Sequence, residues 1–160
     1  MRKCTAMHIV SSSKITMFRD EYAFLSNFYP AVISYRGYQY ANNEAAFQAQ
    51  KALSFTEQQK FCLSRLTNPA DAKRLGRKIT LRPDWEAAKM QYMYEICMAK
   101  YMQHPDLRLA LLSTGDSILI EENQWRDRYW GMVNGHGKNR LAIILMDIRN
   151  KLAAEKDYII

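Results

Sequence analysis

The sequence predicts an α+β fold, a single α-rich domain whose helices pack around a small β-hairpin or sheet. Three observations predict it. A chain of 160 residues suits one domain. Hydrophobic residues at helical spacing recur along most of the chain, and one short segment, residues 32–40, alternates with the two-residue period of a strand. With 48% hydrophobic and 24% charged residues, the composition is typical of a globular protein, and we expect residues 1–160 to form one domain.

The first elements are short strands separated by an aromatic loop. Residues 8–10 and 15–18 are β-like runs, and residues 32–40 are predicted to form a hairpin that turns at Arg36 and Gly37. In the loop between them, aromatic residues surround Ser26 and Asn27. Phe28 and Tyr29 next to small polar residues indicate either the wall of a pocket that stacks a flat ring or plain core.

The segment NNEAAFQAQKAL, residues 42–53, is predicted to be the central helix. An asparagine at its start can accept hydrogen bonds from the first free N–H groups. Glu44, Phe47, Gln48 and Lys51 share one face at helical spacing, and small side chains with Leu53 occupy the opposite arc. The helix therefore presents a carboxylate, an amide and an amine together, either as a site or as an ordinary solvated face.

The rest of the chain is predicted to be mainly helical. Helices are expected at residues 55–66, 69–76, 84–103, 105–112 and 139–154, with a strand at 117–120. Asn68 followed by Pro69 is a helix start, and Lys89 interrupts the apolar stripe of the longest helix. Residues 121–139 form a long segment rich in glycine and tryptophan, and such loops in compact domains are usually functional.

Charge and cysteine content limit the partners. A net charge of +7 and a pI near 9.4 favour an anionic partner, either nucleic acid or a phosphorylated small molecule. The basic residues concentrate between Lys73 and Arg82 without a long basic tail, which favours a discrete phosphate site. Three scattered cysteines and three scattered histidines predict neither a disulfide framework nor a metal site. Because no membrane span or signal peptide is evident, we expect a cytoplasmic protein.

Six motifs, in one order from about residue 18 to residue 152, together resemble the NADAR (YbiA-like) family. They are FLSNFYP, NNEAAFQAQK, LGRKITLRPDWEAAK, LLSTGDSILIEEN, WRDRYWG and GKNRLAIILMDIR. The resemblance implies an α-rich α+β domain with N-glycosidase activity and no cofactor. Some members of the family cleave phosphoribosyl intermediates of riboflavin biosynthesis, and others remove ADP-ribose from guanine in nucleic acid.

The resemblance carries functional residues over to this chain, namely Glu44, Lys51, Trp85, Lys89, Asp127, Trp130, Gly131 and Asn139. Two departures are visible. Ala142 stands where the family usually has glycine, and no histidine follows Glu44. The first affects helix packing, and the second concerns which substrate is used.

Cleavage of a ribosyl C1–N bond requires an anion or nucleophile near C1, a proton donor toward the base, and flat walls. Glu44 and Asp127 suit the first need, and a neutral Lys51 could instead attack C1 of an opened ribose to form a Schiff base. The predicted catalytic residues are therefore Glu44, Lys51 and Asp127. The predicted substrate contacts are Ser26, Asn27, Phe28, Tyr29, Gln48, Arg77, Arg82, Trp85, Lys89, Trp125, Trp130, Gly131 and Asn139.

The alternative is a catalytically silent module that binds ADP-ribose or modified nucleic acid. Retention of Glu44, Lys51 and Asp127 together favours the enzyme, because a binding module does not need carboxylates beside an anionic ligand. The expected partner is a phosphorylated ribosyl molecule or ADP-ribosylated nucleic acid. The sequence does not determine the oligomeric state.

Overall fold

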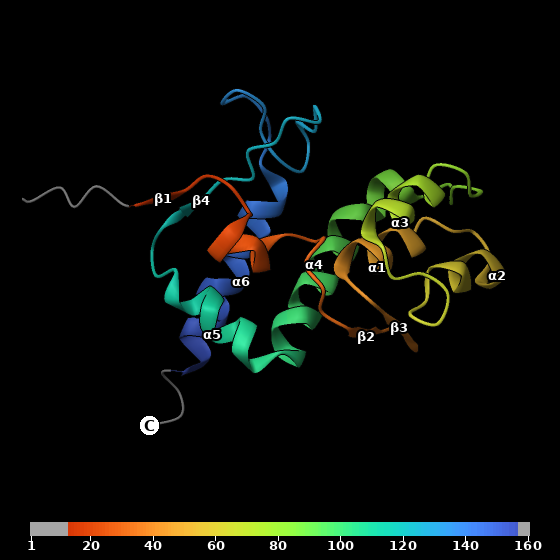
Figure 1. Cartoon of the computed structure of the whole chain (residues 1–160), viewed down its shortest axis with the longest axis horizontal. Coiled ribbons are helices and arrows are strands. Elements are labelled where there is room, and N and C mark those ends of the chain that lie inside the picture. Colours follow the sequence, from red (N-terminus) through yellow and green to blue (C-terminus); the bar gives the residue numbers. More distant parts are fainter. Residues whose placement is uncertain (1–12, 157–160) are drawn as a thin grey trace, which may run out of the picture.

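A computed structural model describes residues 13–156, so the expected strand at residues 8–10 lies outside the described part. The long helix α4 (Trp85–Gln103) runs through the middle of the molecule (Figure 1). On one side it packs against α1 (Asn43–Ala49), which in turn packs against α3 (Pro69–Leu75). On the other side it packs against α5 (Pro105–Ser113) and α6 (Arg140–Lys156). The predicted α-rich α+β architecture is confirmed.

Two small sheets complete the fold. Strand β2 (Ile33–Tyr35) pairs antiparallel with β3 (Tyr38–Tyr40), which confirms the hairpin. Its turn residues Arg36 and Gly37 both have positive φ, the conformation that a two-residue hairpin turn requires. Strand β1 (Lys14–Ile15) pairs in parallel with β4 (Ile118–Leu119), so the start of the described chain lies beside the strand that precedes residues 121–130. The 3₁₀ helix η1 (Asp20–Leu25) follows β1.

The central helix α1 begins where the sequence predicts and ends earlier. The Asn42 side chain accepts a hydrogen bond from the Ala45 N–H at 2.8 Å, which caps the helix. The helix stops at Ala49, and Leu53, expected on the packed arc, is 61% exposed because it lies beyond the helix. The predicted helix 55–66 is also shorter, since it divides into α2 (Phe55–Gln58) and the 3₁₀ helix η2 (Gln59–Phe61).

Lys100 of α4 anchors the loop that carries Ser26. Its side chain is buried, and its ammonium group donates to the carbonyl oxygens of Phe24 and of Ser26, the latter at 3.0 Å. Tyr101 also donates to the Phe24 carbonyl. Burial lowers the pKa of Lys100 to about 8. One buried lysine thus holds the loop against α4.

We expect Lys100→Met to lower the free energy of unfolding by about 1–3 kcal/mol, because it removes the ammonium donor from the carbonyl oxygens of Phe24 and Ser26. Urea unfolding monitored by circular dichroism would measure the change. Lys151→Met on the exposed side of α6 is the matched control and should unfold like the parent protein. Equal unfolding midpoints for both variants would contradict the anchoring role.

Candidate active site

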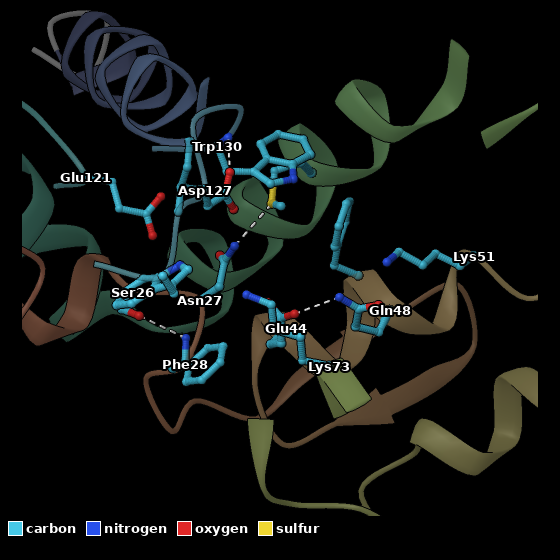
Figure 2. Close-up of a pocket in the computed structure, with 14 residues that line it drawn as sticks. Ser26, Asn27, Phe28, Glu44, Gln48, Lys51, Lys73, Glu121, Asp127 and Trp130 are labelled. Atoms are coloured by element: carbon cyan, nitrogen blue, oxygen red, sulfur yellow. Dashed lines mark hydrogen bonds between the residues drawn. The ribbon is translucent and has the colours of Figure 1, made fainter. Parts of the chain in front are cut away.

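A cavity of about 490 Å³ lies where α1, α3 and α4 meet the loop at residues 26–28 and the segment at residues 121–130. Figure 2 shows Glu121 and Asp127 on one side of it and Glu44, Gln48 and Lys51 on the other. The cavity therefore brings together polar groups from distant parts of the sequence. Its lining residues are Ser26, Asn27, Phe28, Glu44, Phe47, Gln48, Lys51, Lys73, Met93, Glu121, Trp125, Asp127, Trp130 and Leu141.

Glu44 is a buried carboxylate at the floor of this cavity. Its side chain is 7% exposed and accepts a hydrogen bond from Gln48 Nε2 at 2.7 Å. Burial raises its pKa above the ordinary carboxyl value, and the neighbouring Asp127 raises it further, whereas Gln48, Lys73 and Lys51 lower it. The polar face of α1 is thus enclosed and is not an ordinary solvated face.

Lys51 follows the C-terminus of α1, and its amine points back toward Gln48 and Glu44 (Figure 2). No carboxylate lies within ion-pair distance of it in the described residues 13–156. Burial lowers its pKa, as do the positive charges of Lys73, Arg77 and Lys89, while Glu44 raises it. The amine can therefore be deprotonated more easily than an exposed lysine, as a nucleophile requires.

The Asp127 carboxylate both stabilises a turn and lines the cavity. Its Oδ1 accepts hydrogen bonds from the N–H groups of Tyr129 and Trp130 at 3.0 and 2.9 Å. Its backbone is held by Asn123, whose side-chain oxygen accepts from the Asp127 N–H and whose amide donates to the Asp127 carbonyl. One carboxylate oxygen thus shapes the turn that places Trp130, and the side chain still lines the cavity.

The sequence analysis missed two charged residues of the cavity. Glu121 follows β4, and Lys73 belongs to α3 in the basic segment from which only Arg77 and Arg82 were selected. Burial raises the pKa of Glu121 to about 8, and the charges of Asp127 and Glu44 act in the same direction. A carboxylate directly after a short apolar strand was the available sequence signal for Glu121.

The aromatic walls lie partly where they were expected. Phe28, Trp125 and Trp130 line the cavity, with Ser26 and Asn27 between them. Asn27 is tied to α1, because its carbonyl accepts from the Glu44 N–H and its side-chain oxygen accepts from Asn43. Tyr29 does not line the cavity, since its ring lies beside the ammonium group of Lys100.

Besides Tyr29, Gly131 and Asn139, four further predicted substrate contacts lie outside the lining. The Trp85 ring packs 5.0 Å from the ring of Phe47, so it supports a cavity wall from behind. Lys89 pairs with Glu86 at 2.5 Å, and its amine lies 4.1 Å from the Tyr129 ring centroid. The other two are arginines: Arg77 acts on Lys51 through its charge, and Arg82 lines a different cavity.

Arg82 is engaged by its own neighbours. Its guanidinium pairs with Asp84, with an Nε to Oδ1 distance of 2.6 Å, and donates to the Tyr92 hydroxyl. Asp84, two positions along the chain, therefore pairs with the guanidinium group that was predicted to bind a substrate phosphate. The structure leaves Lys73 as the basic residue of this segment that reaches the cavity lining.

Asn139 and Gly131 position the Glu121 segment. Asn139 accepts from the Glu121 N–H at 3.0 Å and donates to the Leu119 carbonyl at 3.0 Å. A Cβ atom on Gly131 would lie 2.4 Å from the Glu121 carbonyl oxygen and 2.6 Å from the Asn123 amide nitrogen. Only glycine allows this approach, so both residues act on the site through the backbone.

Two further findings concern residues 13–156. Histidine, cysteine and acidic side chains in this part of the chain form no cluster of three or more that could hold a metal ion. None of its helices combines the length and the apolar character needed to cross a membrane.

Comparisons with known proteins identify the family of this chain. The NADAR domain family matches residues 15–153. The N-glycosidase YbiA of Escherichia coli is 38% identical over 93% of this chain and 94% of its own length, and an N-glycosidase of Nostoc punctiforme is 36% identical over 82% and 86%. The NMR structure of E. coli YbiA superposes with a TM-score of 0.82 at 36% identity, covering 94% of this chain and 91% of that one. The chain belongs to the NADAR domain family and is an enzyme of the N-glycosidase class.

Proposed function

We propose that the protein hydrolyses the C1–N bond between a phosphorylated ribosyl group and a heterocyclic base. The observation that carries this proposal is the composition of the cavity, where buried carboxylates, two lysines and aromatic walls meet in about 490 Å³. The carboxylates suit the positive charge that develops on the sugar, and the aromatic rings suit a flat base. The lysines suit the phosphate and the covalent step described next.

In this proposal Lys51 is the nucleophile. Its neutral amine attacks C1, the ribose ring opens, and a Schiff base forms that water later hydrolyses. The pKa of Lys51 is lowered, and its amine forms no ion pair with a carboxylate of residues 13–156. Both observations support this role. Glu44 lines the same cavity as Lys51. In this proposal its carboxylate stabilises the charge at C1 and transfers protons to and from water.

We propose the phosphoribosylamino-pyrimidine intermediates of riboflavin biosynthesis as the substrate. Two relatives carry the name riboflavin biosynthesis protein, one from Vibrio vulnificus that is 35% identical over 87% of this chain, and one from Zea mays that is 35% identical over 53%. The chain covers 38% and 15% of those proteins, respectively. The second candidate is ADP-ribose on guanine in nucleic acid, which the net charge of +7 favours.

Base release from the two substrates tests the proposal. The purified protein is incubated separately with the phosphoribosylamino-pyrimidine intermediates and with a DNA oligonucleotide carrying ADP-ribosylated guanine, and the products are separated by chromatography. Release of the pyrimidine alone is the expected result. Release of guanine-containing DNA alone would assign the second candidate, and release from neither would overturn the proposed function.

Lys73 is proposed to bind the substrate phosphate. We expect Lys73→Met to raise KM about tenfold or more, with kcat little changed at a pH high enough for Lys51 to be neutral, because a hydrogen bond to a charged group contributes about 1.5–3 kcal/mol to binding. Lys78→Met, on an exposed residue after the same helix, is the control. Arg82→Ala should also leave KM unchanged because Arg82 lies outside the cavity. Steady-state kinetics on the phosphorylated substrate would measure all three, and an unchanged KM for Lys73→Met would place the phosphate elsewhere.

A further inference from the structure

A second cavity, of about 550 Å³, adjoins the first and shares three residues with it. The shared residues are Ser26, Glu121 and Trp125, so they form the boundary between the two. Glu121 is the carboxylic acid among them. Its neighbour Glu122 lines only the second cavity. Of these two adjacent acidic residues, Glu121 alone reaches both cavities.

The second cavity suits a flat base with polar edges. Phe18 and Trp125 contribute aromatic surface, and the side-chain amides of Gln124 and Asn134 are exposed donors and acceptors. The first cavity holds Lys51 and Lys73 and therefore suits the phosphorylated sugar. A substrate that extends from the first cavity into the second places C1 in the first cavity, between Lys51 and Glu121 (Figure 2), and its base beyond Glu121 and Trp125.

From this arrangement we infer that Glu121 is the general acid of the reaction and gives its carboxyl proton to the base that leaves into the second cavity. The inference rests on the proposed function and deepens it. The backbone supports such a role, because Asn139 and Gly131 fix the Glu121 segment as described above. Figure 2 shows the carboxyl group directed into the first cavity, toward the side of Asn27 and Asp127.

Burial and the surrounding negative charges favour the protonated form of this carboxyl. Burial, Asp127 and Glu44 raise its pKa to about 8, and the opposing influence of Lys73 is smaller. A group with this pKa carries its proton below about pH 8 and loses it above. Glu121 can therefore donate a proton under conditions where an exposed glutamate is ionised.

The electron pair of the C1–N bond stays on the base nitrogen, which takes the proton of Glu121, and Glu121 becomes a carboxylate. As the ribose ring opens, one proton of the Lys51 amine passes to the ring oxygen, which becomes a hydroxyl. Lys51 stays bonded to C1 as a protonated Schiff base until water hydrolyses the adduct. Over the turnover water supplies OH to C1 and a proton to Glu121, so the products are the free sugar and the protonated base, and the enzyme is restored.

Glu121→Gln tests the inference, with Glu155→Gln, an exposed residue outside both cavities, as the control. We expect Glu121→Gln to lower kcat on the order of 10² to 10⁴-fold with KM nearly unchanged. In the unmodified protein kcat should fall as the pH rises above about 8, and this fall should be absent from the residual activity of the variant. Glu155→Gln should keep both the rate and the pH profile of the parent.

A measurement without substrate separates this inference from the proposed function. In protein labelled with ¹³C at glutamate carboxyl carbons, the signal missing from Glu121→Gln should titrate near pH 8. A titration near the ordinary glutamate value, a parental kcat in Glu121→Gln, or a reduced kcat that still falls above pH 8 would each overturn the role of Glu121. Absence of base release from the unmodified protein would instead overturn the proposed function, and the inference with it.

Discussion

Glu44→Gln is expected to reduce turnover on the order of 10² to 10⁴-fold, because a glutamine can neither carry the negative charge that stabilises C1 nor transfer a proton. The fold should remain, since the amide has the same shape and can still accept the hydrogen bond from Gln48. Burial already disfavours the ionised form of Glu44, so we expect a stability change within about 1 kcal/mol.

Single-turnover kinetics and thermal melts of the same preparation would measure both quantities. Glu155→Gln, an exposed residue near the end of α6, is the control for loss of one carboxylate and should behave like the parent protein. Full activity of Glu44→Gln with an unchanged melt would remove Glu44 from the mechanism and leave Asp127 and Lys51 as the candidates.

The sequence predicted the order of the elements because local signals specify them. The Asn42 cap, the turn at Arg36 and Gly37, and Pro69 at a helix start each act within a few residues, and each is found at its predicted position. Helix ends were predicted less well. Residues 50–53 continue the helical pattern, yet the chain leaves α1 at Ala49 and Ala52 forms a bridge with Leu81. That contact joins distant segments, and periodicity cannot reveal it.

The candidate site shows the same division between local and distant information. The helical period correctly placed Glu44, Gln48 and Lys51 on one face, but only the fold shows that residues from 121 to 130 cover this face and make it a cavity. Arg82 was predicted to contact the substrate and does not line the cavity. Its guanidinium group instead forms an ion pair with Asp84 and a hydrogen bond with Tyr92.

Glu121 could not be separated from Glu122 by sequence alone. Both follow the same strand, and their different roles depend on which cavity each one reaches. The raised pKa of Glu121 likewise comes from burial and from the charges of Asp127 and Glu44, which arise only when the chain folds. Chemistry that depends on grouped charges is therefore the part of the site that the sequence specifies least directly.

Treatment with borohydride during turnover is expected to trap a covalent sugar adduct on the parent protein, because hydride reduces a Schiff base to a stable amine. Mass spectrometry of a digest should locate the adduct on Lys51, which lies in the cavity without an ion-pair partner among residues 13–156. Lys51→Ala should yield no adduct and lose activity by several orders of magnitude, as expected when a covalent nucleophile is removed.

Lys73→Met distinguishes a nucleophile from a nearby positive charge. Both lysines line the cavity, and the charge of Lys73 lowers the pKa of Lys51. Removing that charge should raise the pKa of Lys51, so the pH at which the amine becomes neutral and turnover rises should shift upward. The variant should still form the adduct on Lys51. Turnover of the parent protein without any trapped adduct would show that water attacks C1 directly, and Glu44 or Asp127 would then activate it.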